Sequence, residues 1–193
     1  MRLAETPPML RTSVRGPGCY GARPMKSPIW APWRMEYILG KKPAGCVFCA
    51  MAELEPARLP EHHVLAVLAD TFVCLNRYPF AAGHLLVLPR RHSADLFELP
   101  VGEYASFTRV LREAAIRLRR AVRAQGLNVG VNLGEAAGAG ISDHAHGHIV
   151  PRWQGDSNFM PVLADTRVMP QHLDDTYSHL LPHFADIAKD VGP

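Results

Sequence analysis

The chain has 193 residues, a length that fits one domain or one domain with extensions. Apolar residues make up 48% of it, so it can bury a core without needing disulfide bonds to hold the fold together. The formal net charge of +3 is too small to indicate nucleic acid or a membrane surface as a partner.

The cysteines and the apolar runs bear on the cellular compartment. Cys46 and Cys49 form a Cys-x-x-Cys pair, whereas Cys19 and Cys74 stand alone. This arrangement of cysteines is not typical of the disulfide framework of a secreted protein. No apolar run approaches the roughly 18 residues of a membrane helix. The N-terminus also lacks the apolar stretch of a signal peptide. We therefore expect a cytoplasmic protein with no membrane partner.

Residues 1–27 are rich in proline, glycine and arginine and have almost no apolar periodicity. Such a stretch cannot offset the entropy lost when it becomes ordered. We predict a disordered N-terminal extension over residues 1–27, or a start codon placed too far upstream, since Met25 precedes the first residues expected to fold. Residues 28–193 are then one domain that ends in a C-terminal helical extension.

Two kinds of apolar pattern predict the secondary structure. Spacing of three and four residues predicts helices over residues 46–54 and 101–125 and, more weakly, 170–190. Short apolar runs predict strands over residues 64–68, 72–76, 83–88, 128–133 and 143–150. Gly126 is expected to end the long helix. The order of these elements predicts an α+β domain with an antiparallel sheet of about five strands.

The long helix has two distinct sides. Its predicted apolar stripe consists of Tyr104, Phe107, Leu111, Ala114 and Leu118. Its arginines lie mostly away from that stripe and are expected to face solvent: Arg112, Arg119, Arg120 and Arg123. Among the lone cysteines, we expect Cys74 to be half buried on its strand.

Three histidines alternate with small or apolar residues at His144, His146 and His148. On a strand, side chains two residues apart lie on the same face, about 6.5–7 Å from each other. Three interpretations follow. The first is three histidines held by structural hydrogen bonds. The second is a metal site of three imidazoles. The third possibility is a nucleophilic imidazole flanked by two helpers.

The residues before this strand favour the third interpretation. A loop of small residues runs from Gly134 to Gly140, and Asn132 stands at its start. Small residues allow the backbone to approach a ligand closely and to point N–H groups at an anion. An amide, a small-residue loop and imidazoles together are typical of a phosphate site.

These residues resemble the histidine triad (HIT) superfamily. The segment from His144 to Val150 matches its alternating histidine signature, although Ala145 and Gly147 are smaller than usual. The stretch from Asn76 to Pro89 is similar to the family's Gly-His strand. The run after Val150, Pro-Arg-Trp-Gln-Gly-Asp-Ser-Asn-Phe, resembles the branch that includes bacterial diadenosine tetraphosphate phosphorylases. The resemblance covers roughly residues 29–175.

The resemblance implies a reaction and its nucleophile. His146 would attack the phosphorus of a nucleoside 5′-phosphoryl group in a dinucleoside polyphosphate, and His148 would stabilise charge beside it. Water or inorganic phosphate would then release the nucleotide from His146. The family also implies a homodimer. Two alternatives stay open at this point: a nucleoside phosphoramidate hydrolase of the same fold, and a nucleotide-binding protein without turnover.

The resemblance also implies substrate-binding residues. The position of Asn76 corresponds to a ribose-binding residue. The expected apolar walls around the base are Val47, Phe48 and Leu86. Asn132 and Gly140 are expected to line the phosphates. Many HIT hydrolases carry glutamine where this chain has Gly140, and the phosphorylase branch can carry serine there. Gly140 has no side chain that could orient a water molecule. We therefore expect inorganic phosphate, and not water, to release the nucleotide.

The Cys-x-x-Cys pair by itself fits a redox pair, half of a zinc site or two buried thiols. Zinc-containing members of the superfamily add a histidine after the Gly-His strand and the first histidine of the triad. This chain has both residues. The resemblance therefore implies a structural zinc site with the ligands Cys46, Cys49, His92 and His144.

Overall fold

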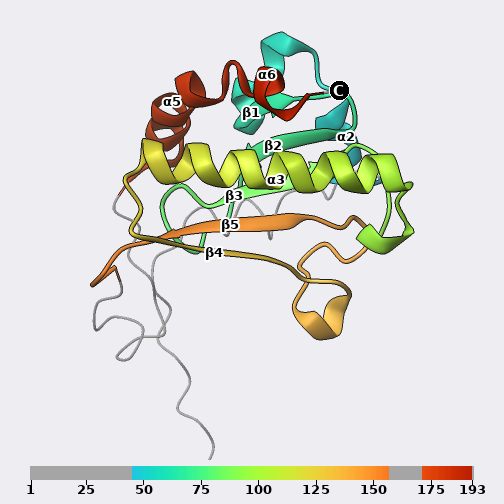
Figure 1. Ribbon diagram of the computed structural model, residues 1–193. Coiled ribbons are helices and arrows are strands. Elements are labelled where there is room, and N and C mark those ends of the chain that lie inside the picture. Colours follow the sequence, from blue (N-terminus) through green and yellow to red (C-terminus); the bar gives the residue numbers. More distant parts are fainter. Residues whose placement is uncertain (1–44, 157–170, 193) are drawn as a thin grey trace, which may run out of the picture.

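Five antiparallel strands form one sheet in the computed structural model, which describes residues 45–156 and 171–192 (Figure 1). The strands lie side by side in the order β1-β2-β3-β5-β4. Their bounds are β1 Val64–Val67, β2 Thr71–Leu75, β3 Leu85–Pro89, β4 Gly126–Val131 and β5 Gly147–Arg152. The predicted α+β class and the antiparallel sheet of about five strands are confirmed. The predicted N-terminal extension lies outside the described residues.

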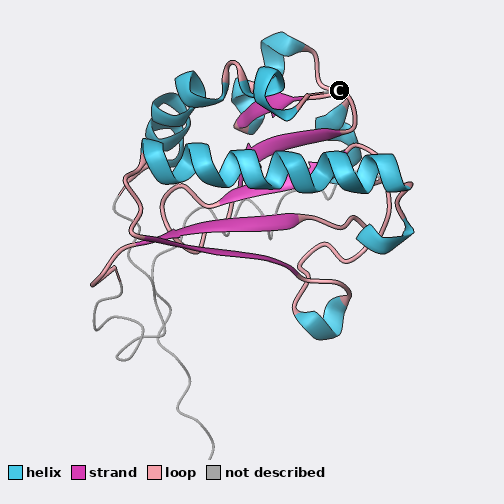
Figure 2. Ribbon diagram, viewed as in Figure 1, coloured by secondary structure: helices cyan, strands magenta, loops and turns pink. Residues whose placement is uncertain are grey.

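Three helices pack on one face of this sheet, and one short helix packs on part of the other (Figure 2). Their bounds are α2 Val47–Ala52, α3 Val101–Ala121, α5 Leu173–Phe184 and α6 Ile187–Val191. Short 3₁₀ turns occupy Pro56–Arg58, Pro60–His62, Leu96–Glu98 and Glu135–Ala137. The weak helical signal over residues 170–190 therefore becomes two helices. None of the described helices is both long and apolar enough to cross a membrane.

Because side chains along each strand alternate between the two faces, the sheet has a separate hydrophobic core on each face. On β3, Leu85 and Val87 pack into the larger cluster, which also contains residues of α3, α5 and α6. Leu86 and Leu88 point the other way and pack with Phe48 of α2. Successive side chains of a strand point to opposite faces, so one short apolar run can serve both cores.

Cys74 belongs to the core on the α2 face and is only 1% exposed. The expectation that it is half buried was wrong, because both faces of the sheet are covered at β2. Burial in this apolar surrounding raises the pKa of the Cys74 thiol to about 12.

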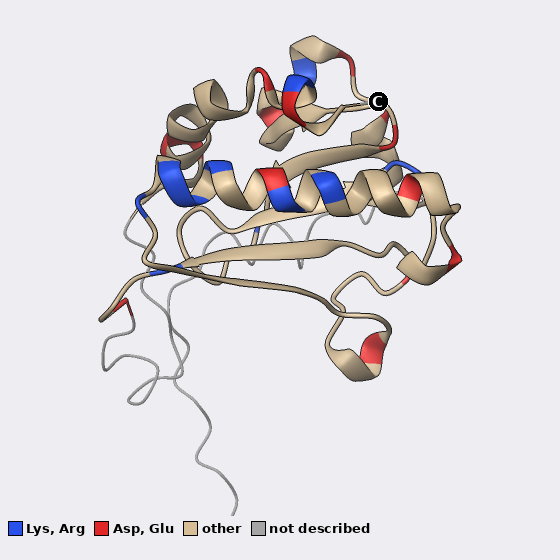
Figure 3. Ribbon diagram, viewed as in Figure 1, with Lys and Arg blue, Asp and Glu red and all other residues tan. Residues whose placement is uncertain are grey.

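Helix α3 packs on the sheet through a stripe at helical spacing. Phe107, Val110, Ala114 and Leu118 are buried, whereas Tyr104, predicted for the stripe, is 36% exposed. The four arginines predicted to face solvent are exposed. Figure 3 marks the charged positions along this helix. The buried stripe of α3 is therefore rotated away from Tyr104 and toward Val110, which the sequence pattern did not predict.

The helix ends at Ala121, four residues before the predicted end at Gln125. Arg123 has a positive φ of 50°, and the N–H of Gln125 donates to the carbonyl of Arg152 at the end of β5. Gly126 is therefore the first residue of β4 and does not cap the helix. Pairing with β5 stops the helix early, since tertiary contacts override helix propensity in a segment that can pair with a strand.

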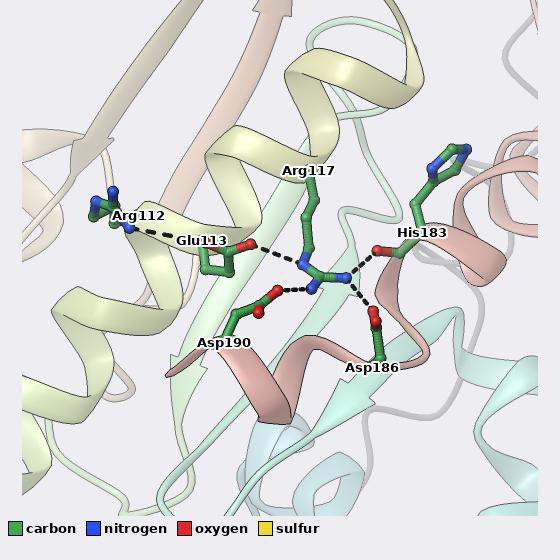
Figure 4. A network of polar contacts seen from close by, with 6 residues as sticks. All are labelled: Arg112, Glu113, Arg117, His183, Asp186 and Asp190. Atoms are coloured by element: carbon green, nitrogen blue, oxygen red, sulfur yellow. Dashed lines mark hydrogen bonds and ion pairs between the residues drawn. The ribbon is translucent and has the colours of Figure 1, made fainter. Parts of the chain in front are cut away.

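Arg117 of α3 has four acceptors, three of which belong to the C-terminal helices and the turn between them (Figure 4). Its guanidinium donates to Glu113 at 2.9 Å, to the carbonyl of His183 at 2.6 Å and to Asp186 at 2.6 Å. It also pairs with Asp190 of α6. The side chains of Arg117 and Glu113 are only 11% and 12% exposed. This network fixes α5 and α6 on α3, and with them the larger core.

Replacing Arg117 by methionine should lower the free energy of unfolding by about 3 kcal/mol, because the largely buried Glu113 carboxylate then loses the closer of its two arginine partners. Urea unfolding measures the change. Arg112→Met is the matched control: Arg112 lies beside Glu113 but its side chain is 75% exposed. The control should change stability by no more than about 0.5 kcal/mol. Equal effects of the two variants would contradict a structural role for Arg117.

Candidate functional site

The histidine segment begins before strand β5. The sequence predicted a strand over residues 143–150, but β5 starts at Gly147, so His144 and His146 precede it and only His148 lies on it. The alternation of the segment nevertheless persists. Ala145 is 3% exposed in the core on the α3 side. The histidines therefore face away from α3 and share one side of the segment.

Close packing against α3 explains why position 147, between two of the histidines, is a glycine. A Cβ atom at this position would lie 3.0 Å from the ring of Phe107 and 3.1 Å from Leu111. Both of these residues belong to α3, which packs closely against the start of β5. A larger side chain at Gly147 would push the helix and the histidine segment apart.

Aromatic rings and imidazoles stand in a row on the opposite face of the sheet. The ring centroids of His146 and His148 are 4.9 Å apart, and those of His148 and His84 are 5.2 Å apart. The Phe48 ring lies 5.3 Å from His146 and 5.5 Å from His144. His84 lies in the stretch that resembles the Gly-His strand, and we predict that it supports the site without touching the reacting atoms. Its place beside His148 results from the pairing of β3 with β5.

His146 has one defined tautomer. Its Nδ1 lies 2.8 Å from the carbonyl oxygen of His144, so the Nδ1–H donates and the Nε2 atom carries the lone pair. The side chain is buried, with 5% of its surface exposed. An imidazole held in this way offers a nucleophilic nitrogen at Nε2.

A chain of hydrogen bonds fixes the tautomer of His148. The N–H of Phe80 donates to His84 Nδ1 at 3.1 Å, so His84 carries its proton on Nε2. That proton is donated to His148 Nδ1 at 3.0 Å. His148 is therefore protonated on its own Nε2, which gives the site a neutral hydrogen-bond donor beside His146.

Burial keeps this pair of imidazoles neutral. Desolvation, assisted by the neighbouring histidines, lowers the pKa of His84 to about 3. The same causes lower the pKa of His148 to about 4. The hydrogen-bond relay therefore keeps one arrangement of protons throughout the physiological pH range.

Asn76 lies at the end of this relay. Its Oδ1 accepts from the N–H of Tyr78 at 2.9 Å, and its Nδ2 lies 3.3 Å from His84 Nδ1. The side chain is half buried at the turn after β2. Ribose binding by Asn76 stays a prediction, and the structure adds a local role in ordering the loop around His84.

The other predicted substrate-binding residues lie in two places. Phe48 and Leu86 are buried in one core cluster, whereas Val47 beside them is 37% exposed. Asn132 is half buried next to the small-residue loop, where its Nδ2 is 3.9 Å from the position of a Cβ atom on Gly138. A Cβ atom on Gly140 would meet nothing within 4 Å. The space at Gly140 is therefore open.

The four predicted metal ligands come together from three separate segments. The ligand atoms of Cys46, Cys49, His92 and His144 all lie within 4.8 Å of one another. His144 Nδ1 is 3.3 Å from the Cys46 sulfur and 3.6 Å from the Cys49 sulfur, and His92 Nδ1 is 3.3 Å from the Cys49 sulfur. Tetrahedral zinc with ordinary bond lengths requires sulfur–nitrogen separations of about 3.6 Å. The donor set and its spacing fit such an ion.

The imidazole of His144 is oriented so that it can act as a metal ligand. Its Nε2–H donates to the carbonyl of Pro89 at 2.9 Å, which leaves the Nδ1 lone pair directed at the two thiols. Burial is the main cause that lowers the pKa of His144 and keeps its imidazole neutral. An open hollow above the cluster is lined by Gly45, Cys46, Cys49, His92 and Asp143.

The sequence and the fold both match known proteins. The family model described as the HIT domain matches residues 60–155, which include all five strands. A protein of Mycobacterium tuberculosis named AP-4-A phosphorylase is 34% identical over 171 residues, covering 86% of this chain and 88% of the relative. The chain belongs to the HIT family. An uncharacterized HIT-like protein of Saccharolobus solfataricus is 30% identical over 60% of this chain and 79% of the relative.

Solved HIT structures agree with this assignment. A zinc-bound histidine triad family protein of Mycobacterium smegmatis has a TM-score of 0.58 and 27% identity, covering 74% of this chain and 95% of that chain. A hypothetical histidine triad nucleotide-binding protein of Sulfolobus tokodaii has a TM-score of 0.57 and 26% identity, covering 74% of this chain and 91% of that chain.

Proposed function

We propose that this HIT protein is an enzyme that cleaves dinucleoside polyphosphates of the diadenosine tetraphosphate type, with His146 as the nucleophile. The observation that carries the proposal is the bond from His146 Nδ1 to the carbonyl of His144, which leaves Nε2 free to attack. The likeness to a protein named AP-4-A phosphorylase supports the choice of substrate.

The reaction consists of two displacements at phosphorus. His146 Nε2 forms a bond to the phosphorus of the 5′-nucleotidyl group, and the bond from that phosphorus to the bridging oxygen of the leaving nucleotide breaks. The Nε2–H of His148 donates to the phosphoryl oxygens as charge develops on them. An oxygen of water or of inorganic phosphate then attacks the same phosphorus and releases His146.

The substrate-binding residues follow the family pattern in this proposal. The base of the transferred nucleotide lies against Val47, Phe48 and Leu86, and its ribose lies near Asn76. The phosphates reach Asn132 and the backbone around Gly140. The open space at Gly140 leaves room for an anion, and glycine allows backbone N–H groups to approach it.

The Cys/His cluster holds a structural zinc ion in this proposal. Its ligands are Cys46, Cys49, His92 and His144, and their spacing fits tetrahedral coordination. When bound, such an ion supplies a cross-link between α2, the loop after β3 and the segment before β5. Four protein ligands fill its coordination, and His146 stays available for the substrate.

The proposal includes a homodimer formed through the edge of the sheet. β4 is an edge strand of the described sheet, and Val129 on it is 49% exposed. An edge strand offers unpaired backbone groups that a second copy can match. The cytoplasmic location and the domain boundary at residue 28 stay predictions.

Product analysis distinguishes phosphorolysis from hydrolysis and tests the function. With diadenosine tetraphosphate, attack by phosphate on the nucleotidyl-histidine gives ADP beside ATP, and attack by water gives AMP beside ATP. We expect ADP to replace AMP as the partner of ATP when millimolar inorganic phosphate is added, because the space at Gly140 admits an anion. Chromatography of the products with and without phosphate measures this. AMP as the sole partner of ATP in excess phosphate would identify a hydrolase, and no turnover at all would refute the proposed substrate.

A further inference from the structure

The backbone that carries the nucleophile is not held by the sheet. β5 begins at Gly147, whose pairing with Val87 and Val131 is the last in both ladders. His146 therefore lies outside the regular hydrogen bonding of the strands. Its tautomer nevertheless depends on the position of one backbone acceptor, the carbonyl oxygen of His144.

Two hydrogen-bonded anchors hold this short segment: one is a residue of the Cys/His cluster, and the other directly follows a residue of that cluster in the sequence. The imidazole of His144 is fixed between the cysteine sulfurs and the carbonyl of Pro89. The N–H of Ala145 donates to the carbonyl of Ser93 at 2.7 Å, and Ser93 directly follows the ligand His92. The position of the His144 carbonyl therefore depends on the cluster and its neighbours, together with the packing of Ala145 in the larger core.

Helix α2 links the same cluster to the nucleophile by a second route. Phe48 stands between Cys46 and Cys49 in the sequence, and its ring lies 5.3 Å from His146. The helix has only six residues and no side-chain cap at its start. A helix this short has little stability of its own. The placement of Phe48 against His146 therefore depends on what the two cysteines bind.

We propose that the Cys/His cluster positions the nucleophile: with its metal bound, it holds the His144 carbonyl and the Phe48 ring so that His146 keeps its Nε2 free and aimed at the substrate. This inference rests on the proposed function. His144 and Ser93 act through His146 and are positioning residues. Loss of the metal leaves the sheet and α3 folded but lets residues 144–146 move. The rate of the chemical step then falls more than substrate binding does.

The experiment compares three variants of the full chain. Cys49→Ser weakens the metal site. His92→Cys keeps four ligands as a Cys₃His set, which binds zinc well. Met51→Ala removes a side chain that packs against the α2-face core but binds no metal, so it reports general loosening of α2. Zinc content is measured by elemental analysis, and kcat and KM are measured with diadenosine tetraphosphate. The ring nitrogens of His146 are observed by ¹⁵N NMR without substrate.

Cys49→Ser is expected to lose its zinc, to lower kcat about 10-fold or more with a smaller change in KM, and to lose the single-tautomer signal of His146. His92→Cys should keep zinc, the tautomer signal and most of kcat. Met51→Ala should lower the melting temperature but change kcat less than about twofold.

Other outcomes separate this inference from the proposed function. A zinc-free Cys49→Ser protein with unchanged kcat and an unchanged His146 spectrum would overturn the positioning role. Equal losses of kcat in Cys49→Ser and Met51→Ala would also overturn it, since general loosening would then explain the result. A parent protein that binds no zinc would refute the proposed metal site. Inactivity of the parent toward the substrate would refute the proposed function, while the NMR comparison would still report on positioning.

Discussion

Replacing His146 by asparagine is expected to reduce turnover of diadenosine tetraphosphate by a factor on the order of 10⁴ or more. Asparagine can still donate to the carbonyl of His144, so the local backbone is preserved, but no atom remains that can form the bond to phosphorus. Steady-state kinetics measure the loss. Mass spectrometry after quenching without acid should show a nucleotidyl adduct on the parent protein and none on the variant.

Binding provides the control for this variant. His146→Asn should still bind a nucleoside monophosphate, because the proposed base and ribose contacts come from other residues. His179→Asn, at an exposed histidine of α5, should retain full activity. Retention of more than a few per cent of kcat by His146→Asn would mean that another group is the nucleophile.

Replacing His84 by leucine is expected to lower kcat by about 100-fold, because His148 then loses the donor that fixes its tautomer. Leucine fills a similar apolar space but cannot donate to His148 Nδ1. His148 is then free to place its proton on Nδ1 and to lose the donor at Nε2. Kinetics at saturating substrate, together with ¹⁵N NMR of His148, measure both effects. A fully active variant would show that the relay is dispensable.

The same pair of histidines predicts how stability depends on pH. The pKa values of His84 and His148, about 3 and about 4 in the folded protein, lie below the ordinary value of 6.5. The unfolded chain therefore binds more protons than the folded chain between pH 6.5 and about 3. The contribution of these two histidines to the free energy of unfolding should be complete above pH 6.5 and should fall as the pH is lowered through this window. In thermal unfolding across pH, His84→Leu should show a weaker dependence than the parent, and identical curves would contradict the assignment.

Local patterns in the sequence were sufficient to predict most of the fold. The apolar runs predicted all five strands, because each run between turn residues can form only a short element with two apolar faces. The stripe on α3 was predicted because its residues recur at helical spacing. The start of β5 was predicted four residues too early, since alternation continues through His144 and His146 although the ladder does not.

Tertiary structure decided where the long helix ends. Helical periodicity continues past Ala121, and Gly126 looks like an ordinary helix terminator. Residues 125–126 instead pair with Arg152 of β5. That contact joins residues 27 positions apart, and no local pattern could predict it.

The candidate site also has some features that the sequence predicts and others that only the tertiary structure decides. The sequence by itself determined which residues are the candidates for chemistry: a row of histidines and a Cys-x-x-Cys pair, whose side chains have few other uses at such spacing. Only the tertiary structure decided which nitrogen of each imidazole is free. The acceptors and donors that fix the tautomers are the carbonyls of His144 and Pro89 and the N–H of Phe80. Every residue has these backbone groups, so their roles depend on how strands and loops pack together and not on the order of side chains along the chain.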